Sequence, residues 1–300
     1  MKFGRTNHPE QVDFTLPEDH PGTQAVLERS NGGGQPKLHV GLAKWKKPDL
    51  EGFYPPGVKD ELAYYSSQFN AIEMNATFYR VFPSSVFAGW RNRTPEDFTF
   101  FPKLHREISH EKRLRDVQQE VDEFLDNASG LGPKLGTVFL QMHEAFGPRP
   151  SQNTRTLVQF IRNWPAGLPL AVELRHTDWF NDAGIADELY ALFEAYGISN
   201  VITDVPARRD LLHMRLTTPS AFIRYGGSGH ESNHPRLDAW VDRLARWSKR
   251  GIQEFAFFFH ETRKAESALL SRYFVEQLND RLQGELHVPV VSQPRQVSLF

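Results

Sequence analysis

Six charged residues stand at the ends of short apolar runs, the positions at which parallel strands commonly present chemistry. They are Glu73, Lys103, Glu173, Arg175, Asp204 and Arg224. The three cations suit a phosphate, sulfate or carboxylate group, because a guanidinium matches such anions geometrically. The three carboxylates could act as general acid and base or hold a divalent cation. We therefore predict a site in which the carboxylates and Lys103 carry the chemistry; the alternative is a set of ion pairs that closes the core.

Other side chains near the same run ends could bind a substrate. They are Trp45, Asn75, Tyr79, His105, Gln141 and Gly227. The two aromatic residues could stack on a base or a sugar, although ordinary packing explains them equally well. Gly227 belongs to a loop, Gly226-Gly227-Ser228-Gly229, whose backbone amides could approach an anion. The alternative for that loop is a flexible connection.

Four residues could also serve as metal ligands. They are His143, His176, His260 and Glu261, all close to the ends of apolar runs. Histidine and carboxylate ligands on separate strands are a familiar arrangement in hydrolases and isomerases. The sequence contains no HExxH or HxH motif, so spacing alone does not define a centre. A divalent metal ion is therefore the candidate cofactor, with its identity open.

These residues need strands to position them, and the sequence offers eight. The predicted strands are Leu38–Leu42, Ala71–Asn75, Phe98–Lys103, Gly136–Gln141, Leu170–Arg175, Asn200–Asp204, Ala221–Tyr225 and Glu254–His260. Apolar residues at helical spacing lie between them, for example Leu114, Val117, Val121 and Phe124. Eight strands alternating with helices predict an α/β fold, a (β/α)8 TIM barrel. The rival doubly wound sheet would carry a glycine-rich turn after the first strand, where Ala43-Lys44-Trp45 stand instead.

The barrel is expected to form a single domain over residues 37–283. Residues 1–36 are polar, contain Pro9, Pro17 and Pro21, and end in three glycines, so we expect an irregular N-terminal extension. Residues 284–300 form a C-terminal tail with Pro289 and Pro294.

Composition limits the class of protein. The 300 residues are 39% hydrophobic and contain no run near the ~20 apolar residues that a spanning helix needs, so we expect no membrane association. The net charge of -2 excludes an extensive basic surface but leaves room for a local basic groove. The absence of cysteine excludes disulfides and thiolate chemistry, and together with an N-terminus lacking an apolar signal core it suggests a cytoplasmic protein.

Several segments resemble the YecE-like family, domain of unknown function 72. They are 69–80, 98–103, 105–110, 171–176, 203–206 and 222–224, with Val40-Gly41, Trp45 and 53–55. The resemblance covers about residues 38–282 and implies a TIM barrel of unestablished function, which has been compared with barrel endonucleases and sugar isomerases at the level of fold. The chain departs from the family pattern at His143-Glu144, at Tyr225-Gly226 and at His260-Glu261.

The last five residues, QVSLF, carry a separate signal. They resemble the peptide with which bacterial DNA enzymes bind the replication sliding clamp. In such a peptide Leu299 and Phe300 would enter an apolar pocket and Gln296 would hydrogen-bond at its edge. The alternative is a tail that packs on its own barrel.

Three functional hypotheses follow. The first is an enzyme acting on a phosphate-containing substrate, which could be a nucleic acid, through phosphoesterase or nuclease-like hydrolysis. The second is an enzyme of the sugar isomerase or epimerase type acting on a small phosphorylated molecule. The third is a clamp-tethered adaptor without catalysis.

Overall fold

The computed structural model describes residues 4–30, 34–260 and 266–291 and shows an α/β fold built on parallel sheets. The strands alternate with helices along the chain, as predicted. The strands are β1 (Lys37–Leu42), β2 (Ala71–Met74), β3 (Thr99–Pro102), β4 (Val138–Gln141), β5 (Leu170–Glu173), β6 (Ser199–Asn200), β7 (Ile202–Asp204), β8 (Ser220–Gly226) and β9 (Glu254–His260).

The strands form two sheets whose named pairs are all parallel. One sheet has the order β3-β2-β1-β9-β8-β7 and the other the order β4-β5-β6. The sheets adjoin at isolated bridges that pair Phe100 with Leu135 and Lys103 with Phe139. At the other junction only Val201 separates β6 from β7, and its backbone N–H donates to the Val172 carbonyl at 3.0 Å.

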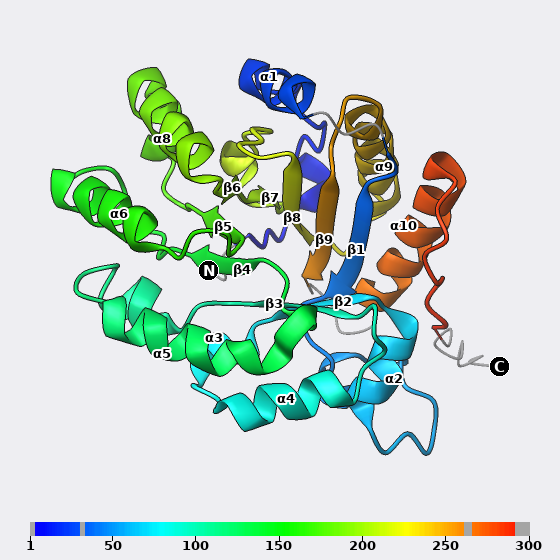
Figure 1. The fold of residues 1–300 in the computed structure, drawn as a ribbon. Coiled ribbons are helices and arrows are strands. Elements are labelled where there is room, and N and C mark those ends of the chain that lie inside the picture. The colour runs from blue at the N-terminus through cyan, green and yellow to red at the C-terminus, as the bar shows by residue number, and fades with distance from the viewer. Residues whose placement is uncertain (1–3, 31–33, 261–265, 292–300) are drawn as a thin grey trace.

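Helices surround the strands, as Figure 1 shows. Each connection between parallel neighbours must cross over, and here the crossovers are mostly helical. The helices are α1 (Pro21–Arg29), α2 (Glu61–Gln68), α3 (Ala76–Tyr79), α4 (Ser84–Asn92), α5 (Gln118–Ala128), α6 (Ser151–Asn163), α7 (Asp178–Asn181), α8 (Ala183–Tyr196), α9 (Asn233–Lys249) and α10 (Glu266–Leu282). The short helical turns are η1 (Pro9–Gln11), η2 (Lys47–Asp49), η3 (Glu107–Glu111), η4 (Ser129–Lys134) and η5 (Arg209–Leu211).

The buried apolar side chains form two groups. The larger group packs helices against the outer faces of the strands. The smaller group lies on the opposite strand faces, and we call it the inner cluster. Its members are Ala71, Phe101, Phe139, Ala171, Val201, Phe222, Ala256 and Phe258. They come from both sheets, so the inner strand faces meet one another in a common core.

The predicted elements agree with the structure apart from local boundaries. Each predicted strand is present, and the sixth is divided into β6 and β7. The helix expected from Leu114 begins at Gln118, because Arg113, Leu114 and Asp116 have φ angles of 48°, 66° and 49°. Left-handed backbone of this kind cannot continue an α-helix, so the apolar residues before Gln118 belong to the preceding loop.

The N-terminal extension is not irregular throughout, because it contains α1. Val26 and Leu27 of this helix are buried, and the Thr23 hydroxyl donates to the Met214 carbonyl at 2.8 Å. Met214 lies in the loop that leads into β8, so α1 covers the amino-terminal ends of the strands. Prolines and the glycine run suggested a linker; the apolar stripe of this one short helix was too brief to stand out.

The described part of the C-terminal tail also packs on the fold. The Asn279 amide donates to the Leu286 carbonyl at 2.7 Å, and the Val290 N–H donates to Gln68 at 2.8 Å. Gln68 ends α2 just before β2, so residues 284–291 run along the amino-terminal side of the strands.

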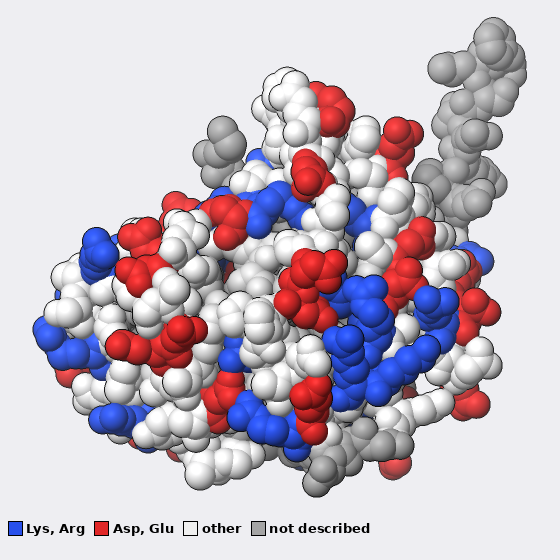
Figure 2. All heavy atoms as spheres, turned by 90° about the horizontal axis from the view of Figure 1, so that it is seen from above, with Lys and Arg blue, Asp and Glu red and all other residues white. Residues whose placement is uncertain are grey.

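The described surface carries mixed charge. Figure 2 shows Lys and Arg interspersed with Asp and Glu over the face seen from above the view of Figure 1. This distribution agrees with the near balance of 35 basic and 37 acidic residues. Among the described helices, none is long and apolar enough to cross a membrane.

Candidate functional site

A layer of polar side chains lies next to the inner cluster, two residues further along each strand. Strand side chains alternate between faces, so the residue two positions after an inner apolar residue points the same way. In six strands this residue is polar and buried, and we call the set the polar layer. Its members are Glu73, Lys103, Gln141, Glu173, Thr203 and Arg224, joined by His260 at the end of β9. The polar layer therefore sits at the carboxyl ends of the strands.

Arg224 of β8 links the carboxylates of β2 and β5. Its Nε donates to Glu73 Oε2 at 2.9 Å and one terminal nitrogen donates to Glu73 Oε1 at 3.1 Å, a two-point pair. Its other terminal nitrogen donates to Glu173 Oε2. The guanidinium is buried together with both carboxylates, so solvent screens the attraction between them only weakly.

Glu173 has a saturated set of donors. Gln141 Nε2 donates to Oε2 at 2.7 Å, and Arg175 Nε and the Thr203 hydroxyl donate to Oε1 at 2.9 and 3.0 Å. With Arg224 included, four side chains fix this carboxylate. Such saturation is typical of a group that positions its neighbours rather than one that exchanges a proton.

Glu73 connects the arginine to a histidine. His260 Nε2 lies 2.9 Å from Glu73 Oε2, and Asn75 Nδ2 donates to Glu73 Oε1 at 2.7 Å. An ionised carboxylate only accepts hydrogen bonds, so His260 carries its proton on Nε2. The second ring nitrogen, Nδ1, is left as the acceptor.

Lys103 completes the polar layer at the end of β3. Its Nζ donates to Gln141 Oε1 at 2.8 Å and lies 4.1 Å from the centre of the Phe78 ring. The side chain is 5% exposed. Burial and the nearby Arg224 charge outweigh the attraction of the two glutamates and lower the pKa of Lys103 to about 7.

The other charges of the layer are held in fixed states. Burial opposes ionisation of Glu73, but Arg224 and His260 outweigh it and hold the pKa of this carboxyl well below its usual range. Burial also raises the pKa of Glu173, but Arg175 and Arg224 outweigh it and hold this pKa below its usual range. Burial and Arg224 lower the pKa of His260, so its imidazole is neutral at pH 7.

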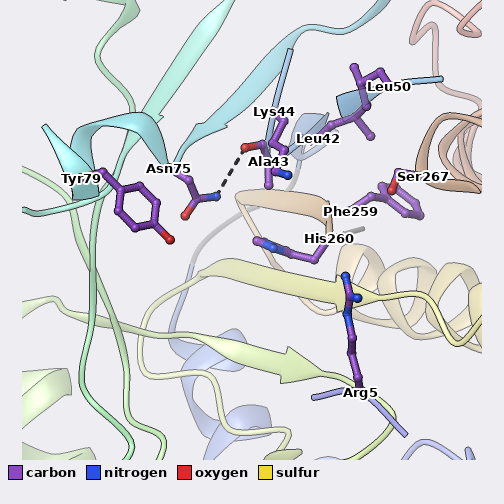
Figure 3. Close-up of a pocket in the computed structure, with 10 residues that line it drawn as sticks. All are labelled: Arg5, Leu42, Ala43, Lys44, Leu50, Asn75, Tyr79, Phe259, His260 and Ser267. Carbon is purple, nitrogen blue, oxygen red and sulfur yellow. Dashed lines mark hydrogen bonds between the residues drawn. The ribbon is translucent and has the colours of Figure 1, made fainter. Parts of the chain in front are cut away.

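A pocket of about 290 Å³ is lined by His260, the partner of the buried Glu73. Figure 3 shows His260, Asn75 and Tyr79 around this space, with Lys44 and Arg5 also contributing to its wall. The Asn75 side chain is fixed there because its Nδ2 donates to Glu73 and also to the Ala43 carbonyl, the latter at 3.4 Å. Tyr79 is 71% exposed, so its ring is accessible.

The prediction that Asp204 joins this group is wrong. Its carboxylate accepts hydrogen bonds from Arg236 and from Trp240 Nε1, both at 2.7 Å, and from Arg209. These partners lie on α9 and η5, on the outer side of β7. Thr203 has the inward position instead, because adjacent strand residues face opposite ways.

The remaining predicted binding residues are scattered. Trp45 is buried and meets Trp90 edge to face at 5.8 Å, so packing occupies its ring. His105 is half-buried and accepts from the Glu107 N–H at 3.4 Å. Gly227 follows β8 in a buried position, and the neighbouring Ser228 N–H donates to Asn233.

The three predicted metal ligands that the structure describes do not come together. His260 pairs with Glu73, His143 lies 5.4 Å from the ring of His110, and His176 is 3.8 Å from Asp178. Within the described ranges, no group of three or more His, Asp or Glu side chains could hold a metal ion. Glu261 and the tail residues Gln296, Leu299 and Phe300 lie outside the described residues.

One residue beside the polar layer could not be predicted from the sequence. His110 lies in η3, seven residues after Lys103, and its ring meets Phe78 at 4.8 Å. Burial, Lys103, His143 and other neighbouring cations lower the pKa of His110 to about 4. Strand parity cannot place a residue on a loop, so no spacing rule pointed to it.

The chain is similar in sequence to a protein family and to two of the proteins described below. Residues 39–295 match the family described as Protein of unknown function DUF72. The chain is 29% identical over 282 residues to the UPF0759 protein YecE of Escherichia coli K12, which covers 88% of this chain and 100% of that protein. It is 26% identical over 177 residues to the UPF0759 protein YunF of Bacillus subtilis 168, which covers 56% of this chain and 61% of that protein.

Two solved structures share the fold. A DUF72 family protein from Enterococcus faecalis V583 superposes with a TM-score of 0.67 at 21% identity, covering 87% of this chain and 99% of the other. A DUF72 family protein from Thermotoga maritima MSB8 gives a TM-score of 0.66 at 25% identity, covering 81% and 99%.

Proposed function

The chain belongs to the DUF72 family, and we propose that it is an enzyme that moves a proton on a small phosphate-containing substrate. The observation that carries the proposal is His260 at the wall of the pocket, paired with the buried Glu73 behind it. A carboxylate that fixes one imidazole nitrogen as a donor leaves the other as a proton acceptor, the arrangement that general base catalysis requires.

The charges around this pair support its role. A neutral imidazole accepts a proton, and Glu73 stabilises the imidazolium that results. Arg224 holds Glu73 ionised, so the carboxylate stays an acceptor throughout. His260 therefore acts as the catalytic base, and Glu73 and Arg224 are positioning residues.

The size and lining of the pocket favour a small polar substrate over a polymer. A volume of about 290 Å³ lies at the lower end of the range for small-molecule sites. Asn75 and Tyr79 offer hydrogen bonds to hydroxyl groups, and two basic residues also stand in the wall, Arg5 and Lys44, the latter paired with Asp49 at 2.9 Å. This combination suits a phosphorylated sugar and the isomerase or epimerase class better than a nucleic acid.

We further propose that the two sheets are arcs of one closed (β/α)8 barrel, with the site at its carboxyl mouth. The bridge between Lys103 and Phe139 supports closure on one side, and the short break at Val201 supports it on the other. The inner cluster draws side chains from both sheets, as a barrel interior does.

The proposal is tested by solvent exchange. Phosphorylated aldoses and ketoses are incubated with the protein in D2O, and deuterium at carbon is followed by NMR. We expect incorporation into at least one substrate, and a loss of about 100-fold or more in His260→Gln. The exposed His234 offers the matched control, His234→Gln, which should keep the full rate.

The outcome that contradicts the proposal is equally specific. Exchange that is unchanged in His260→Gln would remove the histidine from the chemistry. A panel that shows no exchange with any phosphorylated sugar would overturn the substrate class.

The C-terminal sequence QVSLF supports a second proposal, binding to a bacterial sliding clamp. Binding of the full chain to the clamp of its own organism is compared with that of a chain ending at Pro294. Loss of binding on truncation supports the proposal, whereas equal binding of both chains, or binding of neither, contradicts it.

A further inference from the structure

Basic side chains gather beside the polar layer at the ends of β3, β4 and β5. Lys103 follows β3, His143 follows β4 and Arg175 follows β5, while His110 reaches the group from η3. The Lys103 ammonium and the His110 ring flank the same side chain, Phe78, at 4.1 and 4.8 Å. His110 and His143 meet at 5.4 Å.

The acidic partners of this group are already engaged elsewhere. Glu173 accepts from Arg175, Arg224, Gln141 and Thr203, and Glu73 accepts from Arg224, Asn75 and His260. On η3 itself, Glu111 pairs with Arg106 at 2.8 Å and Glu107 pairs with Lys112 at 3.3 Å. Among the residues that the structure describes here, Glu73 and Glu173 balance Arg224 and the adjoining Arg175, so a protonated Lys103 adds one positive charge in excess.

We propose that Lys103, His110 and His143 form the site for the phosphate group of the substrate, with Arg175 completing its positive wall, and that phosphate binding takes up protons. The inference deepens the proposed function, on which it rests for the identity of the substrate. It assigns the phosphate to the β3–β5 side of the mouth and the reacting carbon to the His260 side.

Electrostatics explain the proton uptake. Lys103 faces Glu73, Glu173, Arg175 and Arg224, and His110 faces Lys103, His143, Arg175 and Arg106. Without an anion, burial and mutual repulsion keep part of this group unprotonated: the pKa of Lys103 is about 7 and that of His110 about 4. A bound phosphate dianion stabilises the charged forms and raises both pKa values, so complex formation draws protons from solution.

The sign of the pH dependence follows. Above pH 7 the free protein must protonate Lys103 before phosphate binds well, so affinity falls as the pH rises from 7 to 9. Near pH 5, His110 becomes the group that takes up the proton.

The experiment is calorimetry with inorganic phosphate at pH 7.5, in two buffers of different ionisation enthalpy. H2PO4− that binds as the dianion releases a proton, so this release is subtracted at each pH. We expect the remainder to be proton uptake by the protein, and in Lys103→Met a loss of that uptake with about tenfold weaker binding or more. His110→Gln, measured at pH 5.5, is the second variant and should lose the uptake seen there. His234→Gln is the control for both.

Phosphate binding without proton uptake, or binding that is unchanged in both variants, would overturn the inference, as would no binding at all. His260→Gln keeps the two proposals separate, because it should abolish carbon exchange while leaving phosphate binding intact. Phosphate binding in a protein that exchanges no substrate would contradict the proposed function alone.

Discussion

At the scale of single residues, the site is held by a buried charge network, and removal of one member leaves its partner buried without a counter-charge. In Glu73→Gln, Arg224 loses the two-point pair and keeps only its contact with Glu173. We expect the free energy of unfolding in urea at pH 7 to fall by about 3–5 kcal/mol. As a control, Glu276→Gln breaks an exposed pair with Arg272 and should change the free energy of unfolding by about 0.5 kcal/mol or less.

The loss should itself depend on pH. The folded pKa of Glu73 is lowered, so its stabilising contribution is present above the ordinary carboxyl pKa and disappears as the pH falls through the folded value. A difference between wild type and Glu73→Gln that stays constant down to pH 2 would contradict the charge pairing.

Lys103 predicts a pH effect of the same direction in a higher window. Between pH 7 and about 10.5 the unfolded lysine holds its proton and the folded one does not, so wild-type stability should rise with pH through this window. In Lys103→Met this rise should be absent. Parallel urea melts at pH 7, 8.5 and 10 measure the difference, and equal slopes for the two proteins would contradict the burial of a titrating amine.

Much of the polar layer could be predicted from strand parity, and the exceptions have physical causes. Glu73, Glu173 and Arg224 converge because each follows an inner apolar residue by two positions. Asp204 is one residue out of phase, and the helix α9 that neutralises it lies about 30 residues further along the chain. A sequence pattern cannot show which of two polar neighbours, Thr203 or Asp204, has the inward parity until the strand register is known.

At the scale of elements, close contact between strands positions the layer. A Cβ on Gly41 of β1 would lie 2.1 Å from the Ala71 carbonyl oxygen of β2 and 3.1 Å from the Tyr65 hydroxyl. Gly41→Ala should therefore separate β1 from β2 and lower the unfolding free energy by about 1–3 kcal/mol. The matched control is Gly89→Ala in α4, where a Cβ meets open space and helix propensity favours alanine by about 0.5–1 kcal/mol.

Thermal or urea unfolding of Gly41→Ala, Gly89→Ala and the wild type measures these differences in stability. A Gly41→Ala protein as stable as wild type would show that the strands tolerate a wider spacing than the structure has.

The order of strands and helices could be predicted because apolar runs and helical stripes alternate regularly along the chain. By contrast, α1 and the break at Val201 depend on tertiary contacts that no local pattern encodes.

At the scale of the whole molecule, the family predicted from the segment at 69–80 is confirmed, and closure of the barrel stays a prediction. Closure makes the two junctions between the sheets part of one cooperative unit. The Leu104 amide, which follows β3 and is bonded to the Phe139 carbonyl of β4 at 3.0 Å, should then exchange with solvent as slowly as the amides of β1 and β9. A Leu104 amide that exchanges orders of magnitude faster would mean two separate sheets.

Nitrogen NMR of the His260 imidazole at pH 7 tests most directly whether Glu73 holds this histidine as a neutral base. We expect a proton on Nε2, an unprotonated Nδ1, and a changed Nε2 chemical shift in Glu73→Gln. A histidine protonated on Nδ1, or an imidazolium at this pH, would contradict this expectation.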